Sequence, residues 1–280
     1  PMKRWFAFLL TCALLGSAAA QTLTVYSSVD EANARKILSA FTADTGVQVS
    51  MVFLSTGPAL SRLEAEANRP QADVWFGAPV ENHVIAAERN LVEDYVSPQA
   101  HELAAQYRDS KGSWYAIYTN PLALGVRTDL LAKRSAPVPR SWADLLNPAY
   151  KGLIQMPSPQ TSGTSYELIL TLVKLMGEDQ AFEYMKKLGP NVQTYTQSGT
   201  APSAALGLGG CAIAIQFTPG FLELADKGYP VDVVFPKEGV GHEVAAVSIV
   251  KGAARAAEAH RLVDWIISQK GQQAMVAAKT

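Results

Sequence analysis

The run LTVYSSVDEANARKILSAFTADTGVQVSMVFL, residues 23–54, contains a helical segment between two segments with β-strand character. Residues 23–26 and the alternating residues 47–54 are typical of strands, and residues 31–45 repeat apolar side chains at helical spacing. A helix between two strands is the pattern of a βαβ unit, in which both strands lie parallel in one sheet. This stretch therefore predicts an α/β fold. The residues on the expected buried face of the helix are Ala34, Ile37, Leu38 and Phe41.

The same alternation of strands and helices continues along the chain. Gly57-Pro58 opens an expected helix through Asn68, with the proline at the first helical position, where its missing N–H costs nothing. This order of elements predicts mainly parallel, doubly wound sheets. Further strands are expected at residues 73–76, 153–156, 192–195, 211–217 and 231–235, and further helices at residues 80–89, 162–176 and 178–188, from residue 200, up to residue 227, and at 254–269.

Two longer extended passages, residues 118–127 and 243–250, separate the middle of the chain from its two ends. The simplest architecture lets the chain leave one lobe, build a second and return. Both passages would then cross between the lobes and form a hinge beside a ligand cleft. We expect lobe one to comprise residues 21–120 and 244–280, and lobe two residues 121–243.

The N-terminus has the parts of a secretory signal peptide. Two basic residues at positions 3 and 4 precede the apolar run Trp5–Leu15, and small residues follow up to Ala20. The run is too short to span a bilayer as a helix. The sequence therefore predicts a signal peptide at residues 1–20, cleavage before Gln21, and an exported, soluble protein.

Export would leave one cysteine, Cys211, because Cys12 lies in the predicted signal peptide. A single thiol cannot form an internal disulfide, so a hydrophobic core must stabilise the exported protein. Cys211 begins an apolar stretch, which favours a buried strand residue over a reactive thiol.

Composition and motifs argue against several classes of function. The formal net charge of −1 gives no basic surplus for binding nucleic acid or anionic membranes. The four histidines lack the spacing of metal ligands, and no G-x-S-x-G nucleophile elbow is present. We expect no catalytic residues, no metal site and no cofactor.

Small hydroxyl and glycine residues follow four of the expected strands, where helices begin. Ligands of open α/β sheets bind at this end, and a helix N-terminus offers unpaired N–H groups and partial positive charge to an anion. The alternative is that these residues only cap their helices. Four such loops predict an anion site shared by both lobes, which Phe76 and Gly77 would help to line. The loop residues are Ser27, Ser28, Ser55, Thr56, Gly57, Ser162, Gly163, Thr164, Ser198, Gly199 and Thr200.

A further set of segments is distinctive in combination: residues 23–28, 70–77 (PQADVWFG), 162–164, 195–199 (YTQSG) and 247–253 (VSIVKGA). Together they resemble the periplasmic substrate-binding proteins of ABC importers, and in particular the cluster of ferric-ion, 2-aminoethylphosphonate and hexose-phosphate binders. The resemblance implies a type II fold of two doubly wound lobes joined by two crossing strands. It also implies delivery of the ligand to an inner-membrane permease, without catalysis by this subunit. We expect a monomer.

The resemblance implies different ligand groups for different members. Ferric binders generally place two adjacent tyrosines after the strand that ends here at Phe217, where this chain continues Thr218-Pro219-Gly220-Phe221. A hard Fe³⁺ ion needs anionic oxygen ligands, so iron is the alternative and not the first expectation.

Hexose-phosphate binders are more similar to this chain. The resemblance implies that the hydroxyl loops hold a phosphate, while His242 or Glu243 meets hydroxyl or amine groups. We therefore expect a small anionic organic solute: a phosphate ester, a phosphonate or a carboxylate. A ferric ion is the alternative, and a secreted hydrolase is a distant one. Members of the family commonly continue past the helix that ends here near Ala278, so the resemblance leaves open whether the chain is truncated at Thr280.

Overall fold

Strands and helices alternate in the order expected from the sequence. The computed structural model describes residues 22–280, and the predicted signal peptide, residues 1–20, lies outside them. The strands are β1 Leu23–Ser27, β2 Val49–Phe53, β3 Val74–Pro79, β4 Tyr115–Arg127, β5 Ile154–Pro157, β6 Val192–Thr196, β7 Ile213–Phe217, β8 Val231–Val234 and β9 His242–Ile249. The α-helices are α1 Glu31–Thr45, α2 Thr56–Ala65, α3 Val80–Glu88, α4 Thr128–Lys133, α5 Gly163–Met176, α6 Glu178–Leu188, α7 Ala201–Gly207, α8 Pro219–Asp226, α9 Ala256–Ile267 and α10 Gln269–Ala278.

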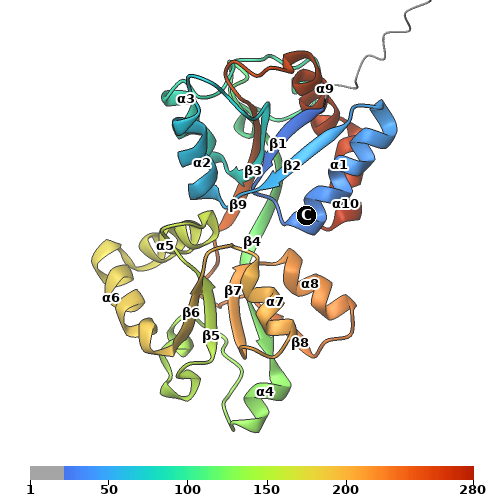
Figure 1. Ribbon diagram of the computed structural model, residues 1–280. Helices are drawn as coiled ribbons and strands as arrows, with labels where there is room; N and C mark the ends of the chain where they lie inside the picture. The colour runs from blue at the N-terminus through green and yellow to red at the C-terminus, as the bar shows by residue number, and fades with distance from the viewer. Residues whose placement is uncertain (1–21) are drawn as a thin grey trace, which may run out of the picture.

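Lobe one is a sheet in the order β2-β1-β3-β9-β4 with helices on both faces (Figure 1). Helices α1, α9 and α10 pack on one face, where Phe41 and Trp265 meet at 5.6 Å between ring centroids. Helices α2 and α3 cover the other face, around Trp75. Each face has its own hydrophobic cluster, which is the arrangement of a doubly wound sheet.

Lobe two repeats this plan with the order β4-β7-β5-β6, and β8 also pairs with β4. Helices α5 and α6 lie on one side of its sheet and α7 and α8 on the other (Figure 1). Cys211 is buried on the α7 side, and burial raises the pKa of its thiol to about 12. The thiol is therefore protonated at neutral pH, as expected for a buried cysteine.

Strands β4 and β9 join the lobes (Figure 1). The first half of β4 pairs with β9, and its second half, Leu122–Val126, pairs with β7. The expected arrangement of two α/β lobes joined by two crossing strands is thus confirmed. We propose the lobe limits given above, since Pro121 and His242 face each other where β4 changes partner.

The sheets are less parallel than the sequence predicts. β1 runs parallel to β2 and β3, and β5 runs parallel to β6 and β7, as expected. β4 and β9, however, are antiparallel to their neighbours. The reason is that one crossing strand carries the chain out of lobe one and the other carries it back.

Several helix ends differ by a few residues from the expected ones, among them the start of α2 and the end of α9. α2 begins at Thr56, so Pro58 occupies the third helical position and not the first. The C-terminal helix is interrupted at Ser268, whose backbone is extended and whose hydroxyl accepts a hydrogen bond from the N–H of Gly271. Ser268 therefore ends α9 and caps α10.

None of the described helices combines the length and the apolar composition that a membrane crossing requires.

The crossing strand β4 packs tightly against α8 in lobe two, which gives a test of the fold. An added Cβ at Gly125 would overlap the Phe221 ring and the Leu206 side chain. Overpacking of this kind costs about 1–3 kcal/mol, so Gly125→Ala should lower the free energy of unfolding by that amount in urea denaturation. At Gly210 the nearest atom to an added Cβ is 3.4 Å away, so Gly210→Ala is the matched control with little expected effect. Equal stabilities of the two variants would contradict the packing described here.

Candidate functional site

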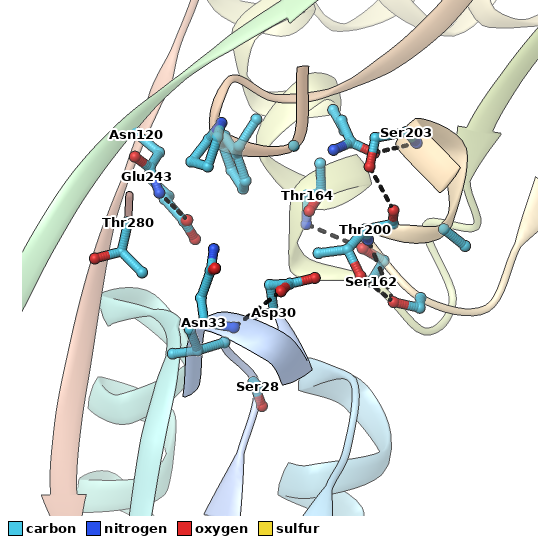
Figure 2. A pocket seen from close by; sticks show the side chains of 18 of the residues that line it. Ser28, Asp30, Asn33, Asn120, Ser162, Thr164, Thr200, Ser203, Glu243 and Thr280 are labelled. Carbon is cyan, nitrogen blue, oxygen red and sulfur yellow. Dashed lines mark hydrogen bonds between the residues drawn. The ribbon is translucent and has the colours of Figure 1, made fainter. Parts of the chain in front are cut away.

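A cavity of about 390 Å³ lies between the two lobes, beside the crossing strands. Its walls come from the loops that precede α1, α2, α5 and α7, from the start of α8, and from the facing sides of β4 and β9. Figure 2 shows polar side chains from both lobes pointing into this space. A cavity of this size suits a small organic molecule.

The structure brings nine of the predicted site residues to this cavity. They come from all four hydroxyl loops and from β9. They are Ser28, Ser55, Thr56, Ser162, Thr164, Ser198, Gly199, Thr200 and Glu243.

Six predicted site residues do not line the cavity. Ser27 and Phe76 are fully buried in lobe one, behind the wall, and His242 is exposed at the start of β9. Gly77 lies against Val29, which would be 2.6 Å from a Cβ at that position. The other two, Gly57 and Gly163, lie where the lobes touch.

The contact between the lobes is close and involves backbone. The N–H of Gly57 donates to the carbonyl of Thr161 at 3.1 Å, and the Ser55 hydroxyl donates to the carbonyl of Gln197 at 3.2 Å. A Cβ on Gly163 would lie 2.8 Å from the hydroxyl of Thr56. The cavity is therefore closed on this side by direct contact between α2 and the loops of lobe two.

One end of the cavity is rich in hydroxyl groups (Figure 2). The Ser162 hydroxyl caps α5 by accepting a hydrogen bond from the N–H of Thr164 at 3.2 Å. The hydroxyls of Ser198 and Thr200 are 3.0 Å apart, and Ser203 donates to the carbonyl of Thr200 at 2.9 Å. This end presents neutral donors and the N-terminus of a 14-residue helix.

The other end carries carboxyl and amide groups. Asn120 donates to Glu243 at 3.4 Å there, while Asp30, which caps α1 through the N–H groups of Ala32 and Asn33, lies between the two ends, on the side of Ser162 (Figure 2). Figure 2 shows Asn120 and Glu243 on the opposite side of the cavity from Thr164 and Thr200. Asn33 and Glu243 are buried, with 4% and 8% of their surfaces exposed.

Burial changes the ionisation of the groups at this end. It raises the pKa of Glu243 to about 8, with smaller contributions from the nearby charges of Glu167 and Glu81, so Glu243 carries a proton at neutral pH. The phenol of Tyr118 has its pKa raised well above its ordinary value by burial and by Glu243. Both groups are therefore neutral and able to donate hydrogen bonds.

Positive charge contributes little to the cavity. Within the described lining, Lys227 is the one basic side chain, and its ammonium group binds the carboxylate of Glu223 at 2.7 Å. An anion in this cavity would be bound by N–H and O–H groups and not by a free cationic side chain.

Most of the residues missed by sequence analysis lie outside the loops. Asn33 lies in the first turn of α1, Tyr118 and Asn120 in β4, and Ser203 in α7, while Asp30 is the residue that precedes α1. Asp30 was recognisable as a helix cap. The position of Asn120 depends on its pairing with Glu243 across β4 and β9, which no local pattern encodes.

Residues 22–280 contain no group of three or more His, Cys, Asp or Glu side chains placed to hold a metal ion. The one phenol among the described cavity residues is that of Tyr118.

Comparison with known proteins places residues 72–280 in a family described as bacterial extracellular solute-binding protein. A probable ABC transporter periplasmic-binding protein, y4fP of Sinorhizobium fredii, is 29% identical over 94% of this chain and 75% of its own length. A putative 2-aminoethylphosphonate-binding periplasmic protein of Salmonella typhimurium is 26% identical over 83% of this chain and 68% of its own.

Among solved structures, the periplasmic binding protein AfuA of Actinobacillus pleuropneumoniae with bound fructose-6-phosphate is similar in both lobes. Its TM-score is 0.88 at 33% sequence identity, over 92% of this chain and 82% of the AfuA chain.

The buried carboxyl of Glu243 predicts a pH-dependent effect on stability. Between pH 4.5 and about 8 the folded protein keeps a proton that the unfolded chain has lost, so the free energy of unfolding falls as pH rises through this window. Glu243→Gln carries no such proton and should gain on the order of 4 kcal/mol relative to the wild type between pH 5 and pH 8 in urea denaturation.

The matched control is Glu88→Gln, because Glu88 is exposed at the end of α3 and takes part in none of the ion pairs of the described residues. Its stability relative to the wild type should not change over the same pH range. A pH-independent difference for Glu243→Gln would show that this carboxyl titrates normally.

Proposed function

Because this chain belongs to the bacterial extracellular solute-binding proteins, the periplasmic binding proteins of ABC transporters, we propose that it captures a small anionic organic solute between its lobes. The fold is the type II fold of that family, shared with AfuA. The proposed solute is a phosphate ester, a phosphonate or a carboxylate, delivered to an inner-membrane permease.

The observation that supports an anion best is the hydroxyl-rich end of the cavity. The α5 N-terminus and the side chains of Ser162, Thr164 and Thr200 supply donors there. Phosphate and carboxylate groups bind at helix N-termini because unpaired N–H groups and the helix dipole both favour negative charge. A hydrogen bond from a neutral N–H or O–H donor to a charged acceptor is roughly twice as strong as one between neutral groups, so neutral donors can hold an anion.

The opposite end suits the uncharged or donor-bearing part of the same solute. Protonated Glu243 and the amides of Asn33 and Asn120 both donate and accept hydrogen bonds. A ligand with hydroxyl groups beyond its anion would find partners there. The two ends together favour a phosphorylated polyol or a similar solute over inorganic phosphate alone.

The family is one of transport-binding proteins, and we propose a role without catalysis for this chain too. We also propose that the mature protein acts in the periplasm as a monomer. The ligand-binding residues that we propose are the nine predicted residues that line the cavity, supplemented by Asn33, Asn120 and Ser203.

A thermal-shift screen tests the solute class. A ligand at a hundredfold excess over its Kd stabilises the folded state by about 2.7 kcal/mol, which should raise the Tm by several degrees. Fructose 6-phosphate, 2-aminoethylphosphonate, malonate and inorganic phosphate are suitable probes. The proposal fails if none of them shifts the Tm, or if loading with ferric citrate produces a visible tyrosinate-to-iron band.

The hydroxyl end is tested by one substitution. Thr164→Ala should weaken the binding of the best probe by about 1.5–3 kcal/mol, because a hydrogen bond to a charged ligand is lost. Isothermal titration calorimetry gives this difference directly. Thr171→Ala is the control on the same helix, since its hydroxyl donates to the carbonyl of Glu167 and does not line the cavity. Equal affinities of the two variants would remove Thr164 from the site.

A further inference from the structure

A histidine outside the cavity is built into the wall of lobe one. His83 lies on α3 and is fully buried. Its Nε2 is 2.6 Å from the carbonyl oxygen of Gly77, and its Nδ1 is 2.7 Å from the Ser248 hydroxyl on β9. Its ring stacks on Trp75 with the ring centroids 4.3 Å apart.

The segment that His83 binds has an unusual backbone. Gly77 and Ala78 have φ angles of 90° and 74°. The second of these is unfavourable for a residue with a side chain and persists only where the surroundings hold it. The pairing of β3 with β9 is also irregular between Phe76 and Pro79, so the sheet alone does not fix this segment.

The same segment shapes the cavity. Ala78 and Pro79 line it, and the Pro79 ring lies within 2.7 Å of where a Cβ on Gly163 would be. Gly163 is the first residue of α5, so the segment sets both the wall of the cavity and the contact between the lobes.

The hydrogen-bond partners define the role of each ring nitrogen. Burial lowers the pKa of His83 to about 4, so the ring is neutral at neutral pH and carries one N–H. The carbonyl of Gly77 can only accept, which places the proton on Nε2. Nδ1 is then an acceptor, and the Ser248 hydroxyl shares its single hydrogen between Nδ1 at 2.7 Å and the carbonyl oxygen of Ser113 at 2.8 Å.

We propose that His83 is a positioning residue of the solute site, because its Nε2–H bond to Gly77 holds the Gly77–Ala78 pair in the left-handed conformation that presents Pro79 to the cavity and to α5. This inference rests on the proposed function, since it assigns the segment to the shaping of a solute site. Trp75 provides a second link, since its Nε1–H donates to the hydroxyl of Ser28, a cavity residue, at 3.1 Å.

Two substitutions at one position separate the two hydrogen bonds of His83. In His83→Gln the terminal amide reaches as far as Nε2 and can donate to Gly77. In His83→Asn the shorter amide can meet Ser248 but not Gly77. Both variants lose the stacking on Trp75 and differ in which of the two hydrogen bonds they keep, so Ser248→Ala is needed as the control for loss of the Ser248 contact alone.

The first measurement needs no ligand. The ¹³Cα and ¹³Cβ chemical shifts of alanine-labelled protein report the φ angle of Ala78. We expect the wild-type shifts to be kept in His83→Gln and to move toward right-handed values in His83→Asn. Ser248→Ala should keep the wild-type shifts, because it leaves the bond to Gly77 in place. Identical shifts in the Asn and Gln variants would overturn the proposal.

The second measurement is the affinity for fructose 6-phosphate by calorimetry, with the urea midpoint recorded for each variant. We expect about tenfold weaker binding by His83→Asn and a change within threefold for His83→Gln. Ala78→Gly in the His83→Asn background should restore part of the loss, because glycine adopts a positive φ without strain. An affinity loss that follows the urea midpoint in both variants, without rescue by Ala78→Gly, would reduce His83 to a stability residue.

The two proposals can fail separately. If the wild type binds none of the anionic probes, the proposed function fails, and the Ala78 shifts still decide whether His83 positions the segment.

Discussion

The pairing of β4 with β9 is the constraint on which the arrangement of the molecule depends. Each lobe buries its own apolar side chains around its own sheet. β4 pairs with β9 in lobe one and with β7 in lobe two, and β9 returns the chain from lobe two to lobe one. Where they cross, they bring Asn120 opposite Glu243. The strands that join the lobes thus also carry polar groups into the cavity, which places part of the candidate site where the lobes join.

The sequence predicts the limits of those helices whose ends are set by the residues directly beside them. The predicted limits of α1 agree with the structure because Asp30 caps its start and Gly46 ends it with a left-handed backbone. The limits of α6 agree as well, between two glycines. The direction of β4 and β9 has no such local cause, since it depends on how many times the chain passes between the lobes. The sheets were for that reason expected to be more parallel than they are.

The residues of the candidate site also divide into those with a local sequence signal and those placed only by the tertiary fold. Ser162 and Thr164 were predictable because a strand, a hydroxyl cap and a helix follow one another in the sequence. Asn33, Tyr118 and Asn120 were not, because they lie within a helix or a crossing strand, and only the tertiary fold turns them toward the cavity. Phe76 and Gly77 were expected at the cavity and instead lie behind it, since the wall is formed by the next two residues, Ala78 and Pro79.

The buried thiol in lobe two bears on how this protein can be used. Cys211 is the one cysteine among the described residues, and its raised pKa and lack of exposure make it a poor nucleophile toward maleimides. New surface cysteines, one on each lobe, would therefore take a pair of dyes without competition from the native thiol. The chain is in this respect already prepared for conversion into a fluorescent reporter of its solute.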